Sequence, residues 1–312
     1  MSGRKVLVFG ATGEIGGRIA CDCVRAGHKV IGISRGKNTR ERVELEGVEM
    51  ICGDKSDENF IRGTVAKLDY DAVINSVPDI KDVEMSCKHL RKAENVLLCS
   101  STGTFVPLRY FPADECHPWR KKTTVNFYPQ CVRDARALEL WETEKFPVSI
   151  LRPTNIIGPG RIPLELWGAR DIAFFKKLKS GESVTISPCE HILLQSGYND
   201  DLADAFVKSL DYPDKVRGEI FIISCKKAIT LGTYLETAMK FLNSKSEIRH
   251  VSPEELMKIY PEITWTNRLD FLLEHMCFDI GKAERTFGYA PRKTAEEGLV
   301  DALEWCEKTG LL

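Results

Sequence analysis

A glycine-rich stretch near the start of the chain places the strongest limit on the fold. Residues 5–20 read KVLVFGATGEIGGRIA, in which a β-branched run is followed by three spaced glycines and then by a helical pattern. Gly10 allows a sharp turn after the strand, Gly13 allows backbone N–H groups to approach a pyrophosphate, and Gly16 allows the helix to pack closely. The positive end of the helix dipole then faces the phosphates. This spacing predicts a dinucleotide site. The alternative is that the glycines make only a tight strand-to-helix turn.

Strand and helix patterns alternate after this turn. We expect strands at 29–34, 48–52, 72–76, 95–99, 148–152 and 219–224, and helices at 58–67, 80–93 and 128–144. Such alternation is typical of an α/β protein with a Rossmann-like doubly wound parallel sheet. We expect a nucleotide-binding Rossmann domain in residues 1–158, completed by 191–226, and mainly a smaller C-terminal substrate lobe in 159–312.

The end of the second expected strand predicts which nucleotide binds. It reads Ser34-Arg35-Gly36-Lys37, where NAD enzymes of this architecture usually carry an acidic residue for the ribose 2′-OH. An arginine there pairs with a 2′-phosphate, so the sequence favours NADP(H), with Lys37 as a second cation. The alternative is a solvated basic loop. Asp54, after the third strand, is placed to accept a hydrogen bond from the adenine amino group.

Charge and cysteine content limit the partners. Lys and Arg total 44 and Asp and Glu total 45, so no overall field attracts nucleic acid or an anionic membrane. The first strand starts near residue 5 and no apolar run has the length of a membrane span, so we expect a cytoplasmic protein without a signal peptide. The 11 cysteines include no CxxC pair, which favours buried free thiols over disulfides or a metal site.

A polar loop at 109–122 offers a different chemistry. It contains His117 and Trp119, the latter followed by the basic run Arg120-Lys121-Lys122. An aromatic ring beside three cations could contact phosphate or RNA, but a short charge run is more often a solvated surface. We interpret His117 as a loop residue rather than a catalytic base.

A set of short motifs is spread along nearly the whole chain. Besides the glycine turn they are Gly53-Asp54, Ser100-Ser101, Leu151-Arg152-Pro153, Ile157-Gly158-Pro159-Gly160, Phe278-Asp279-Ile280, Lys282-Ala283-Glu284 and Gly288-Tyr289. This set resembles the extended short-chain dehydrogenase/reductase superfamily, in its NAD(P)-dependent epimerase/dehydratase branch. The resemblance implies a cofactor on the N-terminal sheet, with substrate between the sheet and the C-terminal lobe. The cofactor contacts that we expect are Gly10, Thr12, Gly13, Glu14, Ile15, Gly16, Ser34, Arg35, Lys37, Asp54, Ser76, Pro153, Asn155 and Ile156.

The resemblance also implies a catalytic Ser or Thr, a Tyr and a Lys. Ser101 takes the hydroxyl position, three residues before Thr104-Phe105, and Tyr128 takes the Tyr position because it opens a helix after the polar loop. The Lys position, four residues later, holds Val132, which supplies no charge to stabilise a phenolate. Either Arg133 substitutes, or reversible oxidation is impaired. The alternative for Tyr128 is an aromatic residue that packs under the loop.

The substrate region departs from the family as well. The stretch 195–203 lacks the arginine with which nucleotide-sugar epimerases hold a diphosphate, and looks more like the atypical members similar to chloroplast stem-loop RNA-binding proteins. Arg161 and Arg170 are the remaining candidate anion contacts. We expect an NADP(H)-dependent oxidoreductase or epimerase-like enzyme acting on a small polar carbonyl or alcohol, with Tyr128 as proton donor or acceptor. The alternative is a redox-inactive nucleotide-binding protein that binds RNA or protein, with nucleic acid the less favoured partner. Analogy alone suggests a homodimer.

Overall fold

The computed structural model describes residues 3–36, 44–122, 127–261 and 268–312, and a parallel β-sheet forms its centre. Within these ranges the sheet has seven strands, in the order β11 (Ile220–Ile223), β6 (Val148–Pro153), β5 (Asn95–Cys99), β4 (Ala72–Asn75), β1 (Lys5–Phe9), β2 (Lys29–Ser34) and β3 (Val48–Cys52). Each neighbouring pair is parallel. The strand order reverses between β1 and β4, which places a ligand crevice at their carboxyl ends. The predicted α/β, Rossmann-like doubly wound sheet is confirmed.

Alternating side chains of the strands supply two cores, one on each face of the sheet. In β1, Val6 and Val8 join one core while Leu7 and Phe9 join the other, because successive side chains of a strand point to opposite faces. Both faces are covered by helices, so the strands are apolar on both sides. Helices α1 (Glu14–Arg25), α6 (Asn199–Ser209) and α12 (Gly281–Phe287) pack on the first face, and α2 (Glu58–Gly63), α3 (Ile80–His89) and α4 (Tyr128–Glu144) pack on the second.

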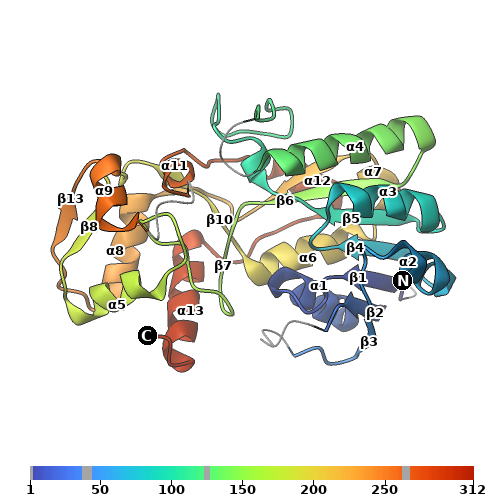
Figure 1. Cartoon of the computed structure of the whole chain (residues 1–312), viewed down its shortest axis with the longest axis horizontal. Coiled ribbons are helices and arrows are strands. Elements are labelled where there is room, and N and C mark those ends of the chain that lie inside the picture. The colour runs from blue at the N-terminus through green and yellow to red at the C-terminus, as the bar shows by residue number, and fades with distance from the viewer. Residues whose placement is uncertain (1–2, 37–43, 123–126, 262–267) are drawn as a thin grey trace.

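The second part of the molecule is a smaller lobe beside the carboxyl ends of the strands (Figure 1). Its helices are α5 (Ile172–Ser180), α8 (Leu231–Phe241), α9 (Pro253–Ile259), α11 (Arg268–Leu272) and α13 (Ala295–Lys308), while α7 (Pro213–Val216) precedes β11. Short strands pair β8 (Val184–Ile186) with β13 (Ile248–His250), β9 (Leu193–Leu194) with β12 (Ile229–Thr230), and β7 (Asn155–Ile157) with β10 (Ser196–Tyr198).

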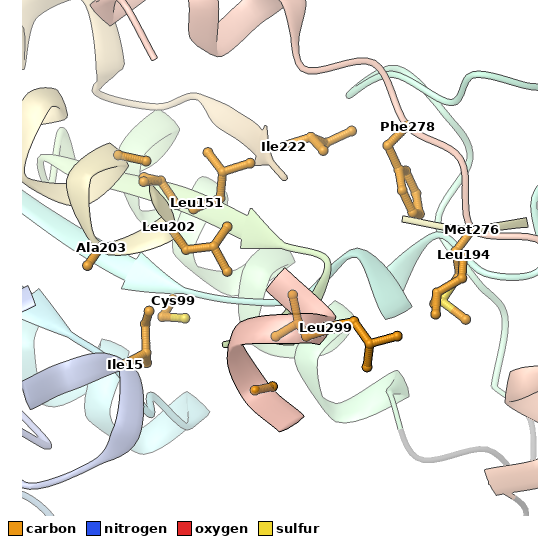
Figure 2. Packing of buried hydrophobic residues seen from close by; sticks show 14 of the residues in the cluster. Ile15, Cys99, Leu151, Leu194, Leu202, Ala203, Ile222, Met276, Phe278 and Leu299 are labelled. Atoms are coloured by element: carbon orange, nitrogen blue, oxygen red, sulfur yellow. The ribbon is translucent and has the colours of Figure 1, made fainter. Parts of the chain in front are cut away.

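One apolar cluster joins the sheet to the lobe. Figure 2 shows it running from Ile15 of α1 and Leu202 of α6, past Leu151 of β6, to Leu299 of α13. Because this core is continuous, the crevice between the two parts has packed walls on both sides. All eleven cysteines are free, and eight of them are buried. Among the helices that the structure describes, none is long and apolar enough to cross a membrane.

Candidate functional site

The glycine turn has room for glycine alone at two positions. Gly10 has φ +78°, and a Cβ there would lie 2.4 Å from Ser76 Oγ. A Cβ on Gly16 would lie 2.2 Å from the Gly10 carbonyl oxygen, so helix α1 could not approach the strand as closely. The N–H of Gly13 donates to that same oxygen at 2.8 Å, so this group closes the turn and does not face a ligand.

The helix start lies one residue further along. Helix α1 starts at Glu14, and its N-cap, Gly13, has no side chain that could cap the first turn. The first N–H groups of a helix lack partners within it and attract anions. The close-packed glycine cradle and this uncapped helix start fit a dinucleotide pyrophosphate.

Two residues predicted as cofactor contacts support the turn from inside. Ser76 is buried and its hydroxyl donates to the Phe9 carbonyl at 2.9 Å, which ties the end of β4 to the end of β1. Ile15 is 8% exposed, and its side chain packs in the core (Figure 2). Only the backbone of Ile15 is therefore available to a cofactor, while the side chain of Thr12 is half-buried within the turn.

The ends of β2 and β3 lie together at the same edge. Gly53 N–H donates to the Ser34 carbonyl at 2.9 Å, and Arg35 follows with an exposed side chain. The Asp54 carboxylate accepts from the Ser56 N–H at 2.9 Å, so one of its oxygens already caps a local turn. Lys37 lies outside the described residues. The roles of Arg35 and Asp54 toward the 2′-phosphate and adenine stay predictions.

A cavity of about 660 Å³ opens at the carboxyl ends of β5 and β6, within the size range of small-molecule sites. Its polar lining comes from strand ends, the segments after them and Gln130 of α4, and its apolar lining comes from Phe127, α11 and nearby loops. The lining residues are Ser101, Thr102, Gly103, Phe127, Gln130, Thr154, Asn155, Ile156, Arg161, Leu164, Gly168, Ala169, Arg170, Phe271, Leu272 and Met276.

The start of α4 presents different residues to this cavity than the sequence predicts. Ser101 lines the cavity as expected and accepts from the Gly103 N–H at 3.1 Å. Tyr128 is half-buried and is not among the lining residues, whereas Gln130 is. Successive helical residues turn by about 100°, so Tyr128 and Gln130 leave α4 in nearly opposite directions. Val132, one turn after Tyr128, is 42% exposed.

Gln130 is a functional candidate that the sequence analysis missed. Its side-chain oxygen is buried and has no hydrogen-bond partner among the described residues, although the residue lines the cavity. A ligand that donates a hydrogen bond would satisfy this acceptor. Its position two residues after Tyr128 gave no signal, because the sequence did not reveal which side of the helix faces the cavity.

A buried charge network lies behind the cavity and involves Arg133. The Arg133 guanidinium donates to the Asp134 carboxylate from Nε at 3.0 Å and Nη2 at 2.6 Å, and to the Pro78 carbonyl from Nη1 at 3.0 Å. Arg152 donates to the other oxygen of Asp134, and so does the hydroxyl of Ser100 at 2.6 Å. All three nitrogens of Arg133 are engaged here, so the substitution of Arg133 for the missing Lys finds no support.

The polar loop packs onto this network. The Trp119 ring lies 4.1 Å from the Arg152 guanidinium carbon, and Arg120 is 8% exposed, with its N–H donating to the Thr104 carbonyl. Of the basic run only Lys121 and Lys122 are exposed. Trp119 and Arg120 therefore do not form an open surface for RNA. His117 is 1% exposed and its Nε2 accepts from the Arg109 N–H at 2.8 Å, which fits a role in shaping the loop.

An ion pair connects the cavity to the glycine turn. Arg161, a lining residue, donates from Nη1 to the carboxylate of Glu14 at 2.9 Å. Three predicted cofactor contacts also lie here, since Asn155 and Ile156 line the cavity and the carbonyl of Pro153, at the end of β6, accepts from the Thr102 hydroxyl at 3.4 Å. The cavity and the expected pyrophosphate position are therefore neighbours.

The N-terminal half of the sheet matches a known family. A model described as "NAD dependent epimerase/dehydratase family" matches residues 6–97. The matched segment includes the glycine turn and ends within β5, so the cavity residues from Ser101 onward lie outside it.

Similar proteins extend the likeness over the whole chain. A relative described as "Chloroplast stem-loop binding protein of 41 kDa b, chloroplastic", from Arabidopsis thaliana, is 26% identical over 96% of this chain and 79% of its own length. A UDP-glucose 4-epimerase structure from Thermotoga maritima, with UDP-glucose, has a TM-score of 0.77 at 16% identity and covers 98% of this chain and 99% of its own. A dTDP-glucose 4,6-dehydratase from Bacillus anthracis, in complex with NAD, has a TM-score of 0.77 at 15% identity, covering 99% and 98%. These structures establish a shared fold with the epimerase/dehydratase proteins.

Proposed function

We propose that this protein is an NADP(H)-dependent oxidoreductase or epimerase-like enzyme that acts on a small polar carbonyl or alcohol bound in the 660 Å³ cavity. The observation that carries the proposal is the contact between the two sites. Arg161 lines the cavity and donates to Glu14 at the start of α1, so a ligand in the cavity lies beside a nucleotide held by the glycine turn. The family match supports a nicotinamide cofactor, and the exposed Arg35 supports the NADP(H) form.

Hydride transfer, binding of the reacting oxygen and proton exchange would be carried out by different groups. A bound nicotinamide supplies or accepts the hydride. Ser101 would hydrogen-bond the reacting oxygen from the cavity wall. Tyr128, at the start of α4, stays the predicted proton donor or acceptor, a role that its place outside the cavity lining does not support. Val132 brings no positive charge that would favour a phenolate. A tyrosine that acts as proton donor in this role would serve carbonyl reduction rather than alcohol oxidation.

The second candidate is a redox-inactive nucleotide-binding protein with an RNA- or protein-binding role. Its support is the Arabidopsis relative, which is named a stem-loop binding protein, together with Val132 at the Lys position. The burial of Arg120 and the stacking of Trp119 on Arg152 count against an RNA surface on the polar loop. For this reason we place the enzyme first.

A nucleotide titration tests the proposal. Purified wild type, Arg35→Ala and Lys29→Ala would each be titrated with NADPH and NADH while nicotinamide fluorescence is followed. Lys29 is an exposed cation at the opposite end of the same strand and serves as the control. We expect NADPH binding that Arg35→Ala weakens at least about tenfold, with Lys29→Ala unchanged, because a charge-assisted phosphate contact is lost.

Two results would reject the enzyme. If the wild type binds neither nucleotide, the dinucleotide site is wrong. If it binds single-stranded RNA at low salt, where phosphate contacts are strongest, and shows no turnover of any carbonyl substrate with NADPH, the second candidate replaces the first.

A further inference from the structure

Glu14 places a carboxylate where a pyrophosphate is expected to bind. It is the first residue of α1, directly after Gly13, and its side chain is 8% exposed. A carboxylate is favoured at a helix N-terminus by the same dipole that attracts phosphates. A carboxylate at this position also repels phosphates, because the two groups carry charge of the same sign. An enzyme that binds a dinucleotide here must neutralise this charge.

Arg161 is held in position to do so. It follows the turn at residues 158–160, whose Pro159 carbonyl accepts from Arg18 of α1 at 2.5 Å and from Asn199 of α6 at 2.8 Å. Gly158 has φ +130°, and a Cβ there would lie 2.5 Å from Asn199 Oδ1, so only glycine fits this packing. The turn is thus fixed to the two helices of the sheet domain, and the Arg161 side chain reaches back to α1.

We propose that Arg161 sets the affinity for the dinucleotide by neutralising Glu14, so that a residue of the cavity wall controls the cofactor site. This inference rests on the proposed function, because it requires a dinucleotide at the glycine turn. Arg161 is a positioning residue in this role. It acts through Glu14 and does not touch the cofactor.

The proposal fixes the order of affinities among variants. Arg161→Ala removes the Arg161 guanidinium from the Glu14 carboxylate and so takes away positive charge beside the expected phosphates. At an effective dielectric constant of about 20, repulsion across roughly 10 Å corresponds to a change in Kd of about tenfold. Glu14→Gln removes the repelling charge, so Arg161→Ala added to it should cost little. This non-additivity separates an action through Glu14 from a direct contact.

The experiment is a titration of the full chain with NADPH, followed by nicotinamide fluorescence, for wild type, Arg161→Ala, Glu14→Gln and the double variant. Arg136→Ala is the control, because Arg136 has a comparable side-chain exposure (32% against 34%) and pairs with Glu139, also at 2.9 Å, on α4. Thermal unfolding without nucleotide verifies that each variant is folded. We expect a Kd about tenfold higher for Arg161→Ala, recovery in the double variant, and no change for Arg136→Ala.

Three outcomes would overturn the inference. If Arg161→Ala binds NADPH with the wild-type Kd, the coupling is refuted and the proposed function is not affected. A double variant as weak as Arg161→Ala shows that Arg161 acts directly on the nucleotide or on the fold, and also refutes it. Absence of NADPH binding in the wild type refutes the proposed function, and the coupling with it.

Discussion

Removal of the Asp134 carboxylate should unfold the protein far more readily than removal of a surface charge. Asp134 is fully buried and accepts hydrogen bonds from Arg133, from Arg152 and from Ser100. Arg152 is also fully buried, and burial lowers its pKa, with the charge of Asp134 opposing that effect. Asp134→Ala leaves two buried guanidinium groups without their counter-ion.

The expected loss in the free energy of unfolding follows from the burial of these charges. Breaking a buried ion pair by deleting one partner typically costs about 3–5 kcal/mol, because the remaining charge stays desolvated. For a chain of this size, roughly 2 °C per kcal/mol gives a fall in Tm of about 6–10 °C. Asp134→Asn keeps an acceptor for hydrogen bonds but loses the charge, and should lie between Asp134→Ala and the wild type.

Chemical denaturation followed by circular dichroism measures the difference. Glu139→Gln is the matched control, since Glu139 lies on the same helix, pairs with Arg136, and has a side chain that is 58% exposed. The free energy of unfolding should change by less than about 0.5 kcal/mol in that control. If the free energy of unfolding of Asp134→Ala falls by less than about 1 kcal/mol, the buried charge network does not stabilise the fold to the extent expected.

Other perturbations test the cavity wall, the glycine turn and the catalytic assignment. Burial raises the pKa of Glu165 to about 7. Its contribution to stability, full below pH 4.5, should thus fall by about 3 kcal/mol as pH rises through 7, and Glu165→Gln should lose this difference in pH-dependent urea unfolding. Gly16→Ala should abolish NADPH binding in fluorescence titrations, because its Cβ would lie 2.2 Å from Gly10 O, whereas Gly63→Ala, with open space around it, should bind normally. Tyr128→Phe should abolish turnover without changing the Kd for NADPH; an active variant would remove Tyr128 from the mechanism.

Local patterns in the sequence were sufficient for the fold and for the nucleotide turn. The helix expected at 128–144 is α4 with those bounds, and the expected strands lie in the sheet. The positive φ of Gly10 and the 2.2 Å approach of a Gly16 Cβ to the Gly10 carbonyl oxygen arise within one turn, so the glycine spacing alone predicted them, whereas the contact of Gly10 with Ser76 comes from the neighbouring strand end. Periodicity and glycine sterics act over a few residues, and the sequence displays such information directly.

The site, by contrast, was decided by contacts between distant segments. The sequence could not show that Gln130 rather than Tyr128 lines the cavity, because that depends on how α4 packs against the sheet and the lobe. The sequence suggested Trp119 as a surface aromatic residue, whereas its ring stacks on Arg152 of β6. The pairing of Glu14 with Arg161 spans 147 residues. Whether a charged or aromatic side chain is exposed, paired or buried depends on the partners that tertiary packing brings to it, and local sequence does not encode them.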